Sequence, residues 1–299
     1  MRTRDAALVQ AIGWGLVLTL GLVLLTAASE PLGGDGRDSI PWGAMYTPNE
    51  HLTDGGMTGA IKHYRGDRGA ATLIADLAPA QACGVRLILT LGSTAPADYL
   101  GANRHLSMDA VRRELDPILA LASEIRPFIA DGTIWGVRFI DEPHDPAGYP
   151  PSFEIDPGEL GEAFALVRSY LGDVRVGSTA PPAYMALVPG AGFASGQVVH
   201  AKLPSGYSDP VAFHRDQSIS AHEHDLAYVA SLNANTNAID NETFFRDYRR
   251  MCEIETVDFA TAWQWPQGHH PMPSFGARFE DADLLVRAEI LRIPAACER

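Results

Sequence analysis

Near the middle of the chain stands the stretch GVRFIDEP, residues 136–143. It begins as an apolar run interrupted by Arg138, which is the composition of a buried strand. The run then stops at two neighbouring carboxylates, Asp141 and Glu142, and Pro143 prevents its continuation because proline has no backbone N–H to donate to a sheet. The stretch therefore predicts a buried strand that ends in two acidic side chains.

Short apolar runs recur along the chain and alternate with longer helix-like segments. The expected strands are Trp42–Tyr46, Val85–Leu91, Ile134–Ile140, Val174–Gly177, Val198–Leu203, Leu226–Leu232 and Phe259–Trp265. The expected helices are Ala70–Ala82, Met108–Ile129, Pro157–Tyr170, Glu242–Glu253 and Ala282–Ile290, with Ser107 and Asp156 as N-caps of two of them. Strand–helix alternation of this kind predicts a parallel α/β architecture.

Seven expected strands do not decide between a closed barrel, which needs eight strands, and an open sheet. An eighth strand would have to lie between Thr47 and Gly69, where Gly, Asp and His dominate and no strand is obvious. An open, doubly wound sheet is the alternative, but no Gly-rich phosphate loop follows a first strand. Since a (β/α)8 barrel is typically about 250 residues long, we predict a TIM-type barrel over residues 41–299.

The N-terminal segment has the layout of an export signal. Arg2 and Arg4 precede an uncharged, apolar run from Ala6 to Ser29. A positive end followed by such a run directs the rest of the chain outward across a membrane. The small residues 26–29 offer a cleavage site, yet the run also exceeds the roughly 20 residues that a membrane-spanning helix needs. Residues 1–29 are thus expected to be a signal peptide or a membrane anchor helix, and residues 30–40 a linker to an extracytoplasmic, secreted or anchored domain.

The charge and the cysteines narrow the choice of partners and compartment. A net charge of −14 argues against nucleic acid and anionic lipid as partners, so membrane contact is expected only through the N-terminal segment. Three cysteines in an exported chain leave at least one unpaired. Cys83 precedes an apolar strand and is expected to be a small buried thiol. Cys252 and Cys297 lie near the ends of the last two expected helices, and we offer them as a disulfide.

The predicted strand ends carry polar and aromatic side chains. In a barrel of this type function resides at the C-terminal ends of the strands. Those ends supply Tyr46, Asn49, Glu50, Ser93, Thr94, Asp141, Glu142, His144, Ser178, Lys202, Asn233, Asn235, Trp263, Gln264 and Trp265. Hydrogen-bonding groups match sugar hydroxyls, and flat indoles stack on the apolar face of a sugar ring. The expected ligand is therefore an oligo- or polysaccharide, with no cofactor and no metal.

The motif Asp141-Glu142-Pro143 resembles the end of the fourth strand in the large clan of (β/α)8 glycoside hydrolases, where the sequence is Asn-Glu-Pro. The resemblance implies hydrolysis of a glycosidic bond with Glu142 as general acid. Trp263 or Trp265, in AWQWP, resembles the Trp that closes the last strand of the clan. The clan's Asn is Asp141 here, and a like charge beside Glu142 should raise its pKa, which helps an acid to keep its proton.

A second departure concerns the nucleophile, a Glu that ends the clan's seventh strand. The corresponding run here ends in Asn233. Three interpretations stay open: Glu50 or Asp240 acts as base in an inverting enzyme, a 2-acetamido group of the substrate acts as nucleophile with Asp141 orienting it, or the barrel binds carbohydrate at the cell surface without cleaving it. The plainer alternative is that Asp141 and Glu142 are solvated loop carboxylates.

Other polar residues are weaker signals. His222-Glu223-His224-Asp225 is the densest histidine cluster, but imidazoles two residues apart on a helix point about 200° away from each other, so we interpret it as a helix terminus. His269 and His270 suit the rim of a cleft. Strict alternation along residues 138–142 puts Arg138, Ile140 and Glu142 on one face, so that Arg138 either meets a buried acid inside the barrel or points outward.

Overall fold

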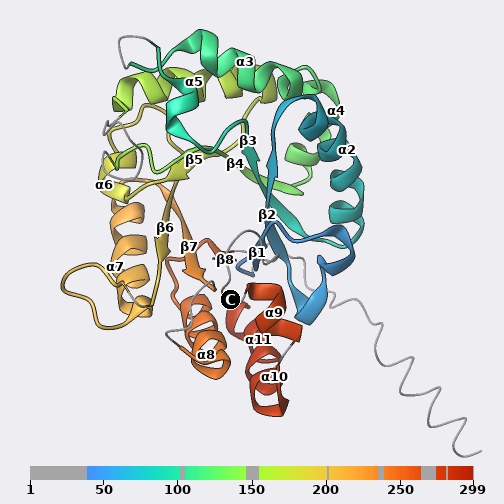
Figure 1. Ribbon diagram of the computed structural model, residues 1–299, viewed down its shortest axis with the longest axis vertical. Coiled ribbons are helices and arrows are strands. Elements are labelled where there is room, and N and C mark those ends of the chain that lie inside the picture. The colour runs from blue at the N-terminus through green and yellow to red at the C-terminus, as the bar shows by residue number, and fades with distance from the viewer. Residues whose placement is uncertain are drawn as a thin grey trace, which may run out of the picture. The chain divides into compact units, whose positions relative to one another are not determined.

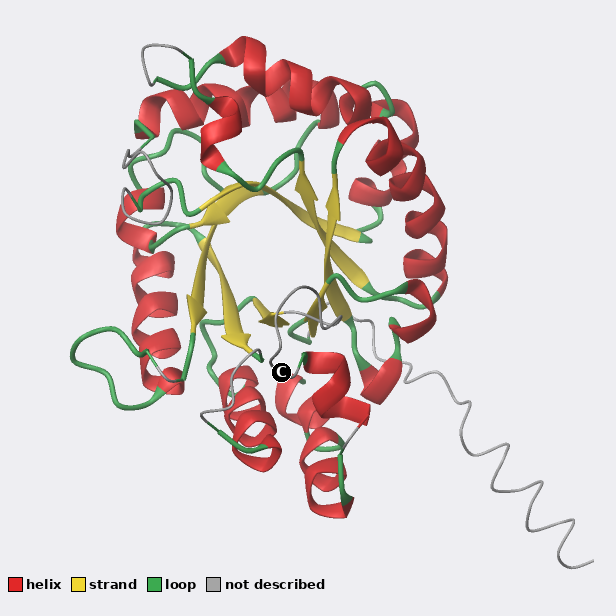
Figure 2. Cartoon of the chain, viewed as in Figure 1, coloured by secondary structure: helices red, strands yellow, loops and turns green. Residues whose placement is uncertain are grey.

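The computed structural model describes residues 39–101, 105–145, 155–200, 202–234, 239–263, 274–280 and 282–298. Eight parallel strands follow one another around a closed barrel, and β1 pairs with β8 to complete the ring. Figure 1 shows the helices placed around this ring, and Figure 2 shows the same arrangement by element type. The predicted (β/α)8 barrel is confirmed, and the open sheet is wrong. The apolar segment 1–29 lies outside the described residues, among which no helix is long and apolar enough to cross a bilayer.

Six of the eight strands match strands expected from the sequence, and a seventh, β2, lies in the interval where a further strand was required. Their bounds are β1 Trp42–Met45, β2 Gly59–Tyr64, β3 Arg86–Leu91, β4 Ile134–Asp141, β5 Val176–Thr179, β6 Phe193–Val198, β7 Ala227–Asn233 and β8 Phe259–Trp263. The missing eighth strand is β2, inside the interval from Thr47 to Gly69. The expected strand Val198–Leu203 is wrong, because β6 ends where that run begins. Its Gly196 packs beneath the hydroxyl of Tyr228, 2.1 Å from where a Cβ would lie, so this glycine serves close packing.

The helices lie between most successive strands or after β8, and they cover the outside of the ring. They are α2 Gly66–Ala82, α3 Met108–Leu119, α4 Ala122–Ala130, α5 Pro157–Leu171, α6 Pro182–Met185, α7 Pro210–Glu223, α8 Asn241–Cys252, α9 Phe275–Glu280, α10 Leu284–Ile290 and α11 Ile293–Cys297. The single helix expected over 108–129 is two, separated at Leu121. Ser107 and Asp156 are confirmed as N-caps. His222 lies in the last turn of α7 and contacts Asp258, so the helix-terminus interpretation is also confirmed.

A plug of large side chains fills the inside of the ring. It comprises Met45, Ile61, Ile88, Trp135, Phe193, Val229 and Phe259, all buried and drawn from seven different strands. The ring of Trp135 lies 5.5 Å from those of both Phe193 and Phe259, between centroids. A much larger apolar cluster lies between the strands and the helices. The barrel is therefore a packed core with a closed floor.

The three cysteines divide into one bridge and one thiol. Cys252 at the end of α8 and Cys297 at the end of α11 form a disulfide, as predicted. Cys83 is exposed, so the expected buried thiol is wrong. It caps the C-terminus of α2, and Gly84 then turns the chain through a left-handed conformation before β3 begins.

The disulfide is expected to contribute measurably to stability. It closes a loop between cysteines 45 positions apart, for which chain entropy predicts about 4 kcal/mol of the free energy of unfolding. The double variant Cys252→Ser/Cys297→Ser should therefore unfold at clearly lower denaturant than wild type in non-reducing buffer. Cys83→Ser is the matched control and should leave the midpoint unchanged. Equal midpoints for double variant and wild type would contradict the assignment.

Candidate active site

Beyond the plug, toward the C-terminal ends of the strands, the side chains that face the interior of the barrel change from apolar to polar. On one side, His63 of β2, Thr90 of β3 and Arg138 of β4 are register partners, two residues beyond Ile61, Ile88 and Gly136. On the other side, Gln197, Ser231 and Thr261 are register partners in β6, β7 and β8. The end of the barrel that holds the C-terminal strand ends, here called the mouth, therefore has a polar lining.

A bulge at the end of β4 decides which carboxylate faces inward. Arg138 pairs with Gly177 and Asp141 with Thr179, so two residues of β4 lie opposite the single residue Ser178 of β5. One of the two is Ile140, whose φ of 58° is left-handed and rare for a β-branched residue. The extra residue resets the alternation. The predicted face containing Arg138, Ile140 and Glu142 is therefore wrong, and Asp141 shares the interior face with Arg138.

Arg138 is buried inside the barrel. Its Nε donates to Thr90 Oγ1 at 2.9 Å and its Nη1 to Thr179 Oγ1 at 3.3 Å. Among the described residues no carboxylate lies within 4.0 Å of its guanidinium, so the acid partner expected for an inward arginine is replaced by two hydroxyls. A buried cation of this kind favours negative charge nearby.

Asp141 is the last residue of β4 and lies one step above Arg138 on the same face. Its backbone N–H donates to the carbonyl oxygen of Thr94 at 3.2 Å, which fixes it against the loop after β3. Its Oδ1 is buried and has no hydrogen-bond partner among the residues that the structure describes. A buried carboxylate oxygen without a protein donor is available to a donor on a ligand.

Glu142 follows the strand with a left-handed φ of 46°. Its N–H donates to the carbonyl oxygen of Thr179 at 3.1 Å, and its own carbonyl accepts from Asp145 N–H at 3.1 Å. The side chain is half-buried. Burial raises the pKa of Glu142, and the negative charges of Asp141 and Asp145 raise it further. The predicted direction is thus confirmed, with burial as the larger cause.

The sequence reading missed His63, which lies on β2 at the level of Arg138. The ring is half-buried, its Nε2 lies 2.6 Å from the carbonyl oxygen of Gly92, and its centroid lies 6.3 Å from the ring of Tyr46. Burial lowers the pKa of His63, the Gly92 hydrogen bond raises it, Arg138 and Arg65 lower it, and Asp141 raises it. Alternation of Gly59, Ile61 and His63 would have revealed this residue if β2 had been recognised as a strand.

Several predicted residues also lie at the mouth. Trp263 and Asn233 are register partners at the ends of β8 and β7, and Trp263 packs against the plug together with Tyr46, which follows β1. His144, two residues after Glu142, is half-buried with its ring 5.9 Å from that of Tyr184. These residues surround the end of the barrel where Asp141 lies.

Other predicted residues lie elsewhere or outside the described chain. Glu50 is exposed in a short 3-10 helix after β1, and Lys202 is exposed in the loop after β6 instead of ending a strand. Ser178 faces away from the interior and donates to the carbonyl oxygen of Phe139. Asp240 is the N-cap of α8 and accepts from Thr243 N–H at 2.7 Å. Asn235, Gln264, Trp265, His269 and His270 lie outside the described residues.

Two interior hydroxyls have no hydrogen-bond partner in the described part of the chain. Ser231 Oγ and Thr261 Oγ1 belong to register partners in β7 and β8, and both are buried without a hydrogen bond to any described residue. Buried hydroxyls are normally satisfied, so these two are available to solvent or a ligand inside the barrel. They add donors and acceptors to the polar lining opposite His63 and Arg138.

The last residues of the strands show which side chains the barrel presents at the mouth. The eight strands end in Met45, Tyr64, Leu91, Asp141, Thr179, Val198, Asn233 and Trp263, so a single strand ends in a carboxylate. Within the described ranges no group of three or more His, Cys, Asp and Glu side chains could hold a metal ion. Among the strand ends at the mouth, Asp141 is thus the acidic residue, and Glu142 follows it directly.

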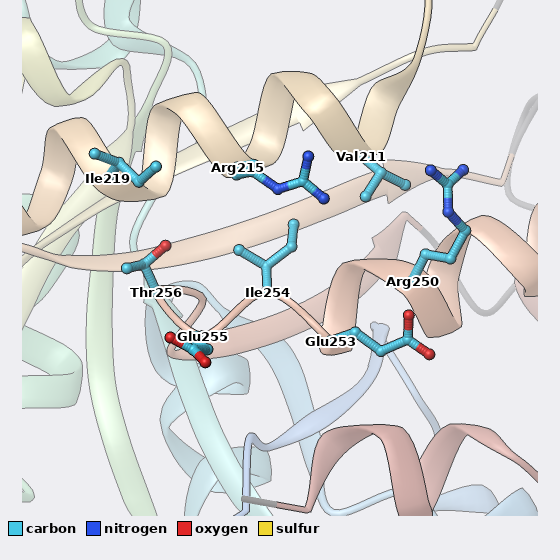
Figure 3. A pocket seen from close by; sticks show the side chains of 8 residues that line it. All are labelled: Val211, Arg215, Ile219, Arg250, Glu253, Ile254, Glu255 and Thr256. Carbon is cyan, nitrogen blue, oxygen red and sulfur yellow. The ribbon is translucent and has the colours of Figure 1, made fainter.

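A separate pocket lies on the outer wall of the barrel. Its volume is about 350 Å³, and it is lined by Val211, Arg215, Ile219, Arg250, Glu253, Ile254, Glu255 and Thr256. Figure 3 shows side chains of α7 on one side and those of α8 and the following turn on the other. Arg250 already contacts Asp209 at 2.9 Å and Asp247 at 3.3 Å. This pocket belongs to the helix layer and is distinct from the mouth.

Comparison with known proteins finds similarity in the fold and none in the sequence families. No protein-family model matches the sequence, and no curated protein matches it. Among solved structures, it is similar to the endo-1,4-β-mannanase from Rhizomucor miehei, with a TM-score of 0.58 at 11% identity, covering 88% of this chain and 96% of that one. The β-mannanase from Streptomyces thermolilacinus, solved with mannohexaose, gives 0.54 at 15%, covering 84% and 87%.

A third structure is the GH5_18 protein from Bifidobacterium longum subsp. longum in complex with Manb1-4GlcNAc. It gives a TM-score of 0.59 at 10% identity and covers 86% of this chain and 78% of that one. At such low identity the similarity shows the fold and leaves the activity to be argued from the site. The chain therefore has the (β/α)8 barrel fold of glycoside hydrolases, as the Asp141-Glu142-Pro143 resemblance implied.

Proposed function

We propose that this protein is a glycoside hydrolase in which Glu142 protonates the leaving oxygen of a glycosidic bond. The observation that carries the proposal is the position of Glu142 directly after the bulge of β4, half-buried, beside Asp141 at the functional end of a closed barrel. Burial and two negative neighbours raise the pKa of Glu142, which suits a group that must hold its proton.

The lining of the mouth supports a carbohydrate substrate. Trp263 and Tyr46 offer aromatic faces, and Asn233, Gln197, Ser231 and Thr261 offer hydrogen-bonding groups. The mannohexaose and Manb1-4GlcNAc complexes of proteins with the same fold support an oligosaccharide ligand. We retain export across a membrane, and a secreted or anchored domain, as part of the proposal on the strength of residues 1–29.

A second candidate function is binding of carbohydrate without cleavage. It is favoured by β7, which ends in Asn233 where the glycosidases of the resembled clan have their nucleophilic Glu. The loop carboxylates Glu50 and Asp240 are exposed, and Asp240 is engaged as a helix cap. The two functions differ in one measurable property, which is turnover.

Replacement of Glu142 should strongly slow the cleavage of glycosides whose leaving group must be protonated. The assay uses 4-nitrophenyl and alkyl β-glycosides of glucose, mannose and N-acetylglucosamine. Glu142→Gln should lower kcat on alkyl glycosides by about 10²- to 10⁴-fold, which is the usual contribution of general acid catalysis. The loss should be smaller for 4-nitrophenyl leaving groups, because nitrophenolate departs without a proton.

The matched control is Glu162→Gln, the same chemical change at an exposed position of α5. It should keep wild-type rates. Unchanged turnover in Glu142→Gln would remove Glu142 from the mechanism. Binding of oligosaccharides by calorimetry, with no cleavage of any glycoside by wild type, would establish the binding function instead.

The pH profile should respond to the neighbours of Glu142. A general acid works while protonated, so kcat/KM is lost as the pH rises through the pKa of Glu142. Since the charge of Asp145 raises that pKa, Asp145→Asn should move this basic limb to lower pH. Asp173→Asn, which changes an exposed carboxylate in the turn before β5, should leave the limb in place. A basic limb that stays fixed, or moves upward, in Asp145→Asn would show that another group sets it.

A further inference from the structure

The structure offers a second reacting group that is not a carboxylate. Hydrolysis with one acid needs a partner that activates water or forms a covalent intermediate. In the described chain the strand ends other than Asp141 supply no carboxylate, and Asp141 itself faces the interior next to Glu142. Among the described residues on the interior face of the barrel, His63 is a proton acceptor of a different kind, an imidazole on β2.

Hydrogen bonding fixes the tautomer of His63. Its Nε2 lies 2.6 Å from the carbonyl oxygen of Gly92, which can only accept, so Nε2 carries a hydrogen. In the neutral ring the lone pair is then on Nδ1. Within the described ranges no hydrogen bond engages Nδ1, so its lone pair can accept a proton.

His63 and Asp141 are attached to the same short loop. His63 donates to Gly92, and the N–H of Asp141 donates to Thr94, two residues further along. Gly92 has a left-handed φ of 74°, and a Cβ there would lie 2.5 Å from the hydroxyl of Tyr99, so the position requires glycine. The loop between β3 and α3 thus fixes the imidazole relative to the backbone of Asp141.

From this arrangement we propose that His63 is the general base of an inverting hydrolysis. This inference rests on the proposed function. Nδ1 accepts a proton from a water molecule whose oxygen attacks the anomeric carbon. The glycosidic C–O bond breaks, and the proton of Glu142 passes to the leaving oxygen. The products are a hemiacetal of inverted configuration and an alcohol, and proton exchange with solvent returns His63 and Glu142 to their starting states.

The surrounding charges suit these roles. The charged groups that His63 meets are Arg65 after its own strand and Arg138 and Asp141 of β4, and Tyr46 is its aromatic neighbour from β1. Burial lowers the pKa of His63 and raises that of Glu142. Both changes increase the fraction of molecules in which the imidazole is neutral while the carboxyl is protonated. The negative charge of Asp141 then stabilises the imidazolium that forms.

The decisive experiment compares His63→Gln with His222→Gln on the 4-nitrophenyl glycosides that wild type cleaves. Glutamine can still donate to the Gly92 carbonyl but cannot accept a proton at neutral pH. His63→Gln should keep the wild-type unfolding midpoint, lose about 10²- to 10⁴-fold in kcat, and lose the acidic limb of the pH profile. His222 lies at the exposed end of α7, and its variant should behave as wild type.

Stereochemistry and rescue complete the test. Proton NMR of early product should show inversion with wild type. Sodium azide, which needs no base, should restore turnover to His63→Ala and give a glycosyl azide of inverted configuration. Retained configuration, or a kcat of His63→Gln within about twofold of wild type, would overturn the role of His63 while leaving Glu142 in place. If Glu142→Gln is fully active, or no glycoside is cleaved, the proposed function falls together with this inference.

Discussion

The mouth of the barrel depends on one backbone irregularity, the left-handed Ile140 in the bulge of β4. Without the extra residue, strict alternation would put Glu142 on the interior face beside Arg138 and would turn Asp141 toward the helices. With it, Asp141 pairs with Thr179 inside the barrel, and Glu142 is placed after the strand end, where its N–H is held by the Thr179 carbonyl. Left-handed φ values at Ile140 and Glu142 cost conformational energy, which the buried side chain of Ile140 and the pairing with β5 offset.

Because the ring of strands is closed, the residues that the bulge turns inward lie in an enclosed space. A packed plug of large apolar side chains forms the floor, so that polar side chains further along the strands face a restricted space instead of bulk water. Charges interact more strongly in such surroundings. This explains how burial can raise the pKa of Glu142 and lower that of His63 at the same end of the same barrel. Opposite shifts for an acid and an imidazole follow from one cause, since burial disfavours the charged form of each.

The sequence was sufficient for the fold class and for most strands, because buried parallel strands are continuous apolar runs. It was not sufficient for β2, where Lys62 and Tyr64 interrupt the pattern. Both residues are buried by their contacts with Asp76 of α2, at 3.2 Å and 2.9 Å, which a search for apolar residues does not detect. His63 was missed with its strand. The bulge was also unpredictable from the sequence, since isoleucine is among the residues least suited to a left-handed conformation.

The departure from the Asn-Glu-Pro pattern of the resembled clan can be understood through Arg138. Its guanidinium is buried inside the barrel and donates to the hydroxyls of Thr90 and Thr179. An amide at position 141 would leave that charge without a negative counterpart on the interior face, where an uncompensated buried ion is costly. Asp141 adds a carboxylate to the face that holds Arg138, without a direct ion pair between the two, and it also raises the pKa of Glu142. The carboxylate in place of the amide thus places a negative charge on the interior face and raises the pKa of the acid, and neither effect requires Asp141 itself to react.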